Sequence, residues 1–199
     1  MVSPVNVSIF PDYILPNLAL LTTNDTSGIK AHSPLVRATY GSCLASLAES
    51  AARFLDMAQA LRVDGSLPTV DPETEFSAAT NAYQSLFDVS RNDLVTHFEQ
   101  QATSLLADSD PAVRRAFLSS VTRLCVFFGR SKANDVLLSH LNTYLNDKDW
   151  TLRYAFFETI VGVATFVGPT NLEEYILPLM TQALTGRLSE LKAEIVANP

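Results

Sequence analysis

The sequence predicts an all-α protein, an α-solenoid of stacked helix pairs, and three observations support this fold class. A stretch of sequence recurs at an offset of 39 residues, from 110–129 to 149–168. Elsewhere apolar residues recur every three or four positions, the spacing of one face of a helix. Short runs of turn-forming residues separate these stretches. Repeats of about 40 residues made from two helices are typical of HEAT and armadillo solenoids.

The two copies agree at polar and glycine positions as well as at apolar ones. The shared acid, arginine and glycine are Asp110 and Asp149, Arg114 and Arg153, and Gly129 and Gly168. Residues 12–16 are echoed at 174–178, and residues 34–37 at 111–114. Each repeat should therefore contain a first helix, a short turn, and a second helix that opens with an apolar residue followed by arginine.

The first half of the chain gives two helices and a loop. Asp12 can cap a helix that ends before the turn-forming run 23–28. Ser33 and Pro34 suit the N-cap and first position of the next helix. Its inward face is predicted to contain Leu35, Val36, Tyr40, Leu44, Leu47 and Ala48, and the pattern extends to Phe54, Leu55 and Ala58. Small residues such as Gly41 suit close approach of a neighbouring helix. Residues 64–72 break the pattern and predict a loop.

The second half predicts five more helical stretches. Residues 73–107 form one long helix, or two joined near 90–92; its apolar stripe contains Tyr83, Leu86, Phe87, Leu94, Val95, Phe98, Leu105 and Leu106. A capped turn ending in Pro111 precedes a helix over 113–128. The next helix begins at Ser131 or Asn134. The second copy of the repeated helix follows at 150–167, and a last helix covers 172–184.

These stretches make a solenoid over residues 1–185 with about three and a half helix pairs, followed by an atypical tail at 186–199. The pairs are 10–60, 73–128 and 131–167, with a half repeat at 171–185. The tail has only a thin apolar stripe. Solenoids end in polar capping repeats, and neither end of this pattern has one. The sequence therefore predicts an uncapped middle segment of a longer array that self-associates when expressed alone.

Composition narrows the possible functions. The chain has 199 residues, 47% of them hydrophobic, and a formal net charge of −7, which disfavours a nucleic-acid scaffold. Cys43 and Cys125 lie in apolar helical patterns and predict two buried thiols in a reducing compartment. Residues 1–10 do not resemble a signal peptide. The most apolar stretch, 154–168, is too short to span a bilayer, so a cytoplasmic protein without a transmembrane segment is expected.

Two groups of residues suggest binding, and each has a structural explanation. Arg37, Arg114 and Arg153 could form a ligand-binding ladder; we favour ion pairs with turn acids such as Asp110 and Asp149, because a guanidinium can satisfy several acceptors at once. Residues 128–132 faintly resemble a phosphate-binding turn, but they lack the full motif and no strand precedes them. We expect a solvated turn there, with Gly129 and Gly168 as structural positions.

No pattern predicts catalysis, a metal site or a cofactor. His32, His97 and His140 lack ligand spacing and are expected on the surface. The aromatic residues Phe117, Phe127, Phe128, Phe156, Phe157 and Phe166 are expected in the core, although solenoids also bind partner helices along one face. An all-helical enzyme remains the alternative from another functional class.

Residues 123–140 resemble one family closely: the kinase-like regulatory subunit of the class III phosphatidylinositol 3-kinase complex, vacuolar protein sorting subunit fifteen. Residues 10–16, 51–55, 145–153 and 155–163 extend the resemblance over roughly 5–185. The match to 123–140 is specific because a generic HEAT repeat constrains only its apolar positions. Members of this family carry a serine/threonine kinase-like domain, a HEAT solenoid and a WD40 propeller, and this chain resembles only the solenoid.

The resemblance implies a scaffold that binds the lipid kinase catalytic subunit and a beclin-like subunit, in autophagy and in endosomal and vacuolar sorting. It also implies peripheral association with late endosomal, vacuolar or autophagosome-forming membranes through the complex. We expect the partner interface to include Arg130, Lys132, Asn134 and Asp135, because folding alone does not explain their identities. The alternative is a HEAT adaptor of another pathway, of the importin or phosphatase-scaffold type.

Overall fold

The computed structural model describes residues 10–21, 33–63 and 76–185, and these segments are helical with short turns and contain no strand. Four expectations lie outside the described residues: the turn-forming run at 23–28, the position of His32, the loop at 64–72 and the tail at 186–199. The helices before the repeated region are η1 (Phe10–Ile14), α1 (Leu15–Ala19), α2 (Pro34–Val63) and α3 (Phe76–Leu106). The stretch predicted as one or two helices at 73–107 is therefore the single helix α3 within its described part.

The repeated region contains two long helices and several shorter, continuous helical pieces. The long helices are α4 (Pro111–Phe128) and α7 (Trp150–Val167). Between them the chain passes through α5 (Arg130–Lys132), η2 (Ala133–Leu138), α6 (Ser139–Leu141) and η3 (Asn142–Asn146). After α7 follow α8 (Pro169–Asn171), η4 (Leu172–Ile176) and helical residues 177–185. Each shorter series acts as the first helix of a pair.

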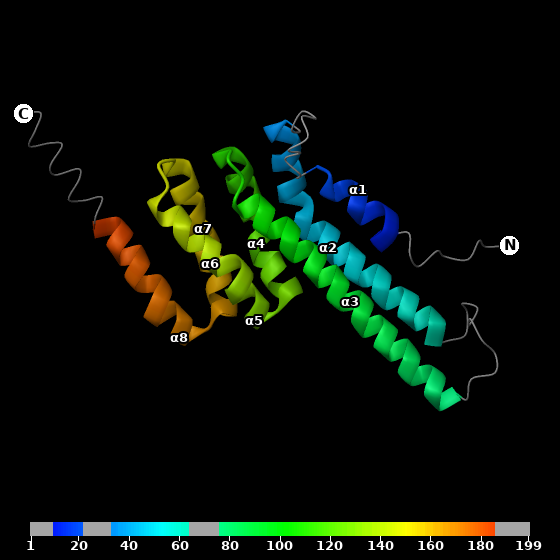
Figure 1. The fold of residues 1–199 in the computed structure, drawn as a ribbon. Coiled ribbons are helices and arrows are strands. Elements are labelled where there is room, and N and C mark those ends of the chain that lie inside the picture. Colours follow the sequence, from blue (N-terminus) through cyan, green and yellow to red (C-terminus); the bar gives the residue numbers. More distant parts are fainter. Residues whose placement is uncertain (1–9, 22–32, 64–75, 186–199) are drawn as a thin grey trace, which may run out of the picture.

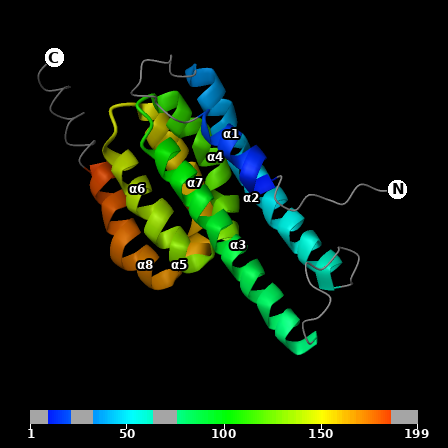
Figure 2. The same cartoon turned by 45° about the vertical axis from the view of Figure 1, so that its right-hand side comes forward.

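The described helices form two layers, as an α-solenoid requires (Figure 1). The second helices of successive pairs, α2, α4 and α7, pack side by side in one layer. The other layer contains α3, the helical stretch 130–146 and the stretch 169–185, visible edge to edge in Figure 2. Helices α2 and α3 are longer than the others and extend together beyond the stack (Figure 1).

Glycine ends both repeated helices in the same way. Gly129 and Gly168 have φ angles of 77° and 87°, which a residue with a side chain rarely adopts. The carbonyl of Gly129 then accepts a hydrogen bond from the Ala133 N–H at 2.9 Å. A new helix therefore starts immediately after each glycine, at Arg130 and Pro169, and the predicted starts at Ser131 or Asn134 and at Leu172 were too late.

The core follows the predicted periodicity through both copies. Phe117 and Phe156, equivalent in the repeat, are both 0% exposed. Of the aromatic residues expected in the core, Phe128 is also buried, while Phe127, Phe157 and Phe166 are partly buried against the core. Gly41 allows α2 to approach α4 closely, because a Cβ at this position would lie 3.3 Å from Phe117 Cβ.

Several apolar residues do not face the core as predicted. Leu35, Val36 and Leu86 are exposed at 75%, 40% and 55%. The inward face of α2 instead begins at Arg37 and continues through Tyr40. Leu35 and Val36 belong to the first turn of α2, before this face begins. Cys43 is exposed and only Cys125 is buried, because Cys43 precedes Leu44 and points away from the face that Tyr40 and Leu44 share.

Candidate functional site

Arg37 forms a buried ion pair with Asp108, not with Asp110 as the sequence suggested. Its Nε and Nη2 donate to the two carboxylate oxygens of Asp108 at 2.7 and 3.0 Å, and the two side chains are 7% and 5% exposed. Burial opposes ionisation of Asp108. Hydrogen bonds from Arg37 and from the Asp110 N–H outweigh that effect, so the pKa of Asp108 lies below its ordinary value.

Arg114 repeats this arrangement at the next junction. Its Nη2 donates to Asp147 Oδ2 at 2.6 Å, and its Nη1 donates to the carbonyl of Asp108 at 2.8 Å. The guanidinium also lies 5.8 Å from the centre of the Tyr144 ring. Arg153 donates to the carbonyl of Asp147 in the same manner. Successive helix pairs are thus connected by arginine and the first acid of each Asp-x-Asp turn.

The second acid of each turn caps a helix and does not form the ion pair with arginine that the sequence also suggested. Asp110 Oδ1 accepts from the Ala112 N–H at 2.8 Å, and Asp149 Oδ1 accepts from the Thr151 N–H at 2.9 Å. Both residues are therefore N-caps of α4 and α7. The sequence places both acids of a turn within reach of the arginine, and only the packed structure distinguishes the ion-pair acid from the cap.

The four predicted interface residues lie within positions 130–135, at the start of the helical stretch 130–146. Arg130 is exposed, but its Nε donates to the Phe166 carbonyl at 3.2 Å. Lys132 Nζ contacts Glu99 Oε2 at 2.7 Å across the junction with α3, with both side chains partly exposed. Asn134 is half-buried and Asp135 is exposed. Two of the four side chains therefore also join elements of the fold.

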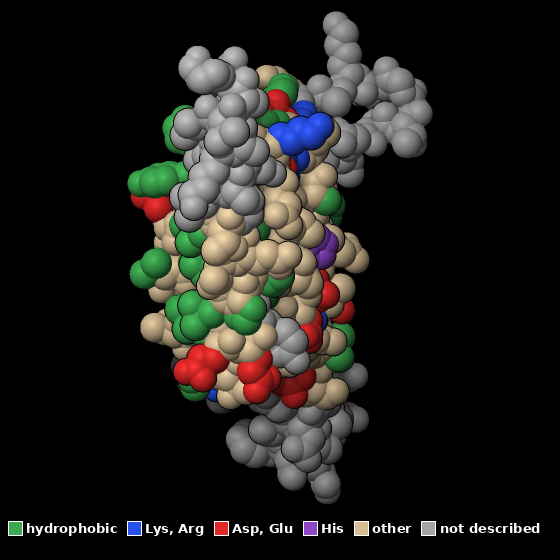
Figure 3. All heavy atoms as spheres, turned by 90° about the vertical axis from the view of Figure 1, so that its left-hand side faces the viewer, with side chains coloured by type: hydrophobic (Ala, Val, Ile, Leu, Met, Phe, Trp, Pro, Cys, Tyr) green, Lys and Arg blue, Asp and Glu red, His purple; other side chains and the backbone are tan. Residues whose placement is uncertain are grey.

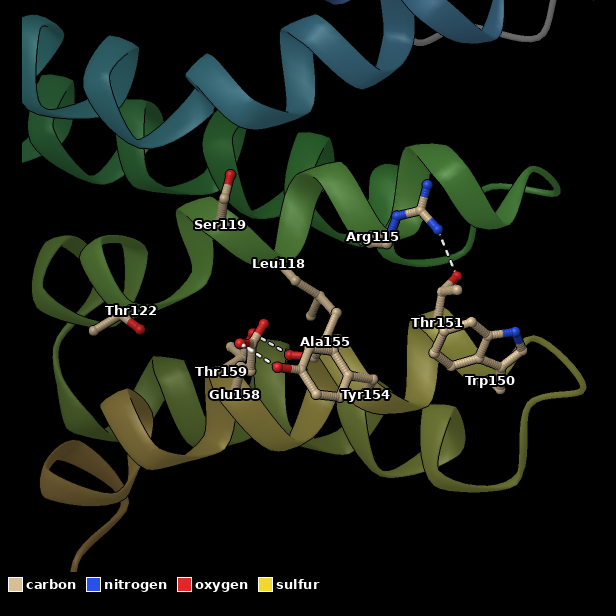
Figure 4. A pocket seen from close by; sticks show the side chains of 10 residues that line it. All are labelled: Arg115, Leu118, Ser119, Thr122, Trp150, Thr151, Tyr154, Ala155, Glu158 and Thr159. Carbon is tan, nitrogen blue, oxygen red and sulfur yellow. Dashed lines mark hydrogen bonds between the residues drawn. The ribbon is translucent and has the colours of Figure 1, made fainter.

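A groove of about 770 Å³ lies between α4 and α7. Figure 4 shows that α4 contributes one wall, with Arg115, Ser119 and Thr122, and α7 the other. Trp150 and Tyr154 line the α7 side and are 68% and 59% exposed. The groove therefore presents aromatic surface with a cation at one end.

Polar contacts hold the side chains at the two ends of the groove. Arg115 Nη1 donates to Thr151 Oγ1. The Tyr154 hydroxyl donates to Glu158 Oε1 at 3.0 Å, and this carboxylate raises the pKa of Tyr154 above its ordinary value. Sequence reasoning missed this group, although a helical projection could have found it. Trp150, Tyr154 and Glu158 recur at a four-residue spacing, two positions out of register with the core residues Leu152 and Phe156.

The described part of the chain contains no cluster of three His, Cys, Asp or Glu side chains suited to a metal ion. His97 is half-buried rather than on the surface, its ring packs edge-on against Phe98, and burial lowers its pKa. His140 is also half-buried, with Nδ1 3.1 Å from the Val136 carbonyl.

None of the helices in the described ranges combines the length and apolar character needed to cross a bilayer.

The face at the end of the stack carries separate apolar patches rather than one continuous surface (Figure 3). Acidic side chains gather at one edge of this face (Figure 3). Among the helical residues 177–185, Leu177 and Leu184 are 44% and 56% exposed. The self-association predicted from the sequence stays a prediction.

Comparison with known proteins identifies the family. A family model described as "PIK3R4-like, middle domain" matches residues 1–189. The chain is 39% identical over 186 residues to the probable serine/threonine-protein kinase vps15 of Dictyostelium discoideum, covering 92% of this chain and 9% of that protein.

Two yeast proteins show the same relationship. Identity to the serine/threonine-protein kinase vps15 of Schizosaccharomyces pombe is 46% over 140 residues, covering 70% of this chain and 8% of that protein. The VPS15 kinase of Saccharomyces cerevisiae is 35% identical over 139 residues, covering 70% of this chain and 9% of that protein. The chain thus spans about a tenth of the length of these relatives. It belongs to the PIK3R4-like family and corresponds to the middle, helical-repeat domain of Vps15 proteins.

Proposed function

We propose that this chain is a non-catalytic scaffold segment of the regulatory subunit of the class III phosphatidylinositol 3-kinase complex, acting in autophagy and in endosomal and vacuolar protein sorting. The observation that carries the proposal is the family match, which covers residues 1–189 and concerns the middle domain. The relatives named as Vps15 kinases are about ten times longer, which supports the proposal that kinase chemistry belongs to other regions of those proteins.

The proposed mechanism is geometric. Buried apolar residues from both layers form one core. The ion pairs Arg37–Asp108 and Arg114–Asp147 then fix each helix pair against the next. A stack joined at every described junction favours a constant separation between partners bound at different positions along it. This property suits a scaffold that positions a catalytic subunit.

The proposed partners are the lipid kinase catalytic subunit and a beclin-like subunit. The chain would reach late endosomal, vacuolar or autophagosome-forming membranes peripherally, through these partners. Arg130, Lys132, Asn134 and Asp135 form the proposed interface. The exposure of Arg130 and Asp135 supports this assignment, because both can contact a partner while the Arg130 Nε hydrogen bond holds its side chain in place.

Co-purification tests the proposal. The full 199-residue chain is co-expressed with the two subunits, and recovery is compared with a variant carrying Arg130→Ala, Lys132→Ala, Asn134→Ala and Asp135→Ala. Recovery should fall at least about tenfold, equivalent to about 1.4 kcal/mol, while helicity measured by circular dichroism is unchanged. The exposed contact between Lys132 and Glu99 costs at most about 1 kcal/mol when lost, so the variant should fold.

Substitution of exposed residues on α2 provides the matched control. Thr39→Ala, Ser42→Ala and Ser50→Ala remove hydroxyls that donate only to carbonyls of their own helix. This control variant should co-purify like the original chain. Unaltered recovery of the four-residue variant would refute the interface. Failure of the original chain to recover either subunit would refute the scaffold assignment and favour an adaptor of another pathway.

A further inference from the structure

The groove between α4 and α7 contains aromatic residues that solenoid packing does not require. At the offset of 39 residues, Trp150 corresponds to Pro111 and Tyr154 corresponds to Arg115. The preceding repeat therefore stacks without an aromatic side chain at either position. Both rings are more than half exposed, so they contribute little to the core. Large aromatic side chains exposed beside an arginine are the residue types that dominate binding energy at protein interfaces.

The two ends of the groove carry opposite charges. Arg115 is the only basic residue that lines it and Glu158 is the only acidic one. Neither side chain forms an ion pair with another described residue. Arg115 lies against Thr151, so the charged groups are separated by about two turns of α7, or about 10 Å. Trp150 and Tyr154 provide apolar surface along the same wall (Figure 4).

We propose that this groove binds an amphipathic helix from a partner protein. The partner helix carries an acidic and a basic side chain two turns apart, with an apolar residue between them. Its acid pairs with Arg115, its base pairs with Glu158, and its apolar residue packs on Tyr154. A helix fits because two parallel neighbouring helices leave a groove in which a third can lie. The proposal rests on the groove alone and does not depend on assignment to the lipid kinase complex.

The chain contains its own probe for this site. Trp150 is the only tryptophan in the sequence, so tryptophan emission reports directly on the groove. The full chain is titrated with a stapled, Ala-rich helical peptide that carries Glu and Lys about seven residues apart with Leu between them. The emission of Trp150 should shift and saturate. The two charges fix the direction of the bound peptide, because reversal would place its Glu beside Glu158 and its Lys beside Arg115.

A variant of the groove that prefers a peptide of different charge distinguishes specific binding from nonspecific adhesion to the aromatic rings. Arg115→Glu makes both ends of the groove acidic, so this variant should bind the Glu–Lys peptide at least tenfold more weakly than the original chain. It should instead prefer a matched Lys–Lys peptide. Tyr154→Ala should weaken binding of the Glu–Lys peptide about tenfold. Leu184→Ala removes an exposed apolar residue that does not line the groove and should change nothing.

Four outcomes would overturn the proposal. The first is an unchanged Trp150 emission on titration with the Glu–Lys peptide. The second is a variant with Arg115→Glu that keeps the peptide preference of the original chain, which would show that charge does not select the occupant. The third is equal binding of a peptide with a central proline, which would indicate an extended occupant. The fourth is shielding of Trp150 that increases with chain concentration alone, which would indicate a second copy.

Discussion

The two junctions between successive second helices follow one sequence pattern but differ in how closely they are packed. Where α2 meets α4, the Ser120 hydroxyl donates to the Gly41 carbonyl at 2.8 Å, and Gly41 lies directly against Phe117. Where α4 meets α7, Gly162 lies just as close to Thr122, but a groove of about 770 Å³ opens along the rest of the junction. The residues on the facing surfaces therefore decide whether a junction is closed or leaves room for a ligand.

The ion pairs at these junctions differ in the same direction. The Arg37 and Asp108 side chains are 7% and 5% exposed, whereas those of Arg114 and Asp147 are 15% and 25% exposed. A buried charged side chain that loses its partner retains the full cost of desolvation. For a partly exposed charged side chain, water compensates part of the lost interaction. The same motif should therefore have different energetic importance at the two junctions, and substitutions can test this.

Replacement of Asp108 should have the largest effect. Asp108→Asn keeps the size of the side chain and removes the carboxylate that pairs with the buried Arg37 guanidinium. The free energy of unfolding should fall by about 3–5 kcal/mol, measured by urea denaturation followed by circular dichroism. Asp110→Asn is the matched control, since asparagine caps helices about as well as aspartate. A loss below about 1 kcal/mol for Asp108→Asn would contradict the importance assigned to burial.

Replacement of Asp147 should have a smaller effect at the more open junction. Asp147→Asn removes a charged hydrogen-bond partner of Arg114 at a site that solvent can reach. The expected loss is about 1.5–3 kcal/mol, measured under the same conditions as for Asp108→Asn. Equal losses for the two variants would show that the difference in exposure has no energetic consequence. A larger loss for Asp147→Asn would reverse the comparison.

Acid should have the smallest effect of the three, because it removes only the stability that comes from ionisation of Asp108. The folded-state pKa of Asp108 lies below its ordinary value, and the unfolded value is about 3.9. The ionised carboxylate therefore stabilises the folded state fully above about pH 4, and this contribution disappears as pH falls through the folded pKa. The gap in unfolding free energy between the original chain and Asp108→Asn should narrow below pH 4. A gap that stays constant across that range would refute the role of Asp108 ionisation.

Local sequence determined much of the repeat architecture. The 39-residue offset, the caps at Asp110 and Asp149, and the glycines at 129 and 168 depend on short-range chemistry. An aspartate before a helix can accept the first free N–H groups, and glycine alone readily adopts a positive φ. The repeat and its turns predicted helices over 113–128 and 150–167, and the structure has them at Pro111–Phe128 and Trp150–Val167. The cap role of Asp149 was found only in the structure. The starts of the following helices were misjudged because the extent of each glycine turn depends on its backbone angles.

Tertiary packing decided which of several similar residues has each role. Asp108 and Asp110 both act electrostatically on Arg37, and only the stacked pairs bring Asp108 onto the guanidinium. The outward positions of Leu35 and Cys43 likewise depend on how α2 is rotated against α4.

The groove is the clearest case of a feature that needs the whole fold. Its walls come from helices in two different pairs, so no local pattern contains it. Sequence by itself determined that this protein is a stack of helix pairs with an arginine and paired acids at each junction. Only the tertiary structure decided which acid bonds, which junction closes and which surface stays open, because each of these depends on contacts between residues more than 30 positions apart.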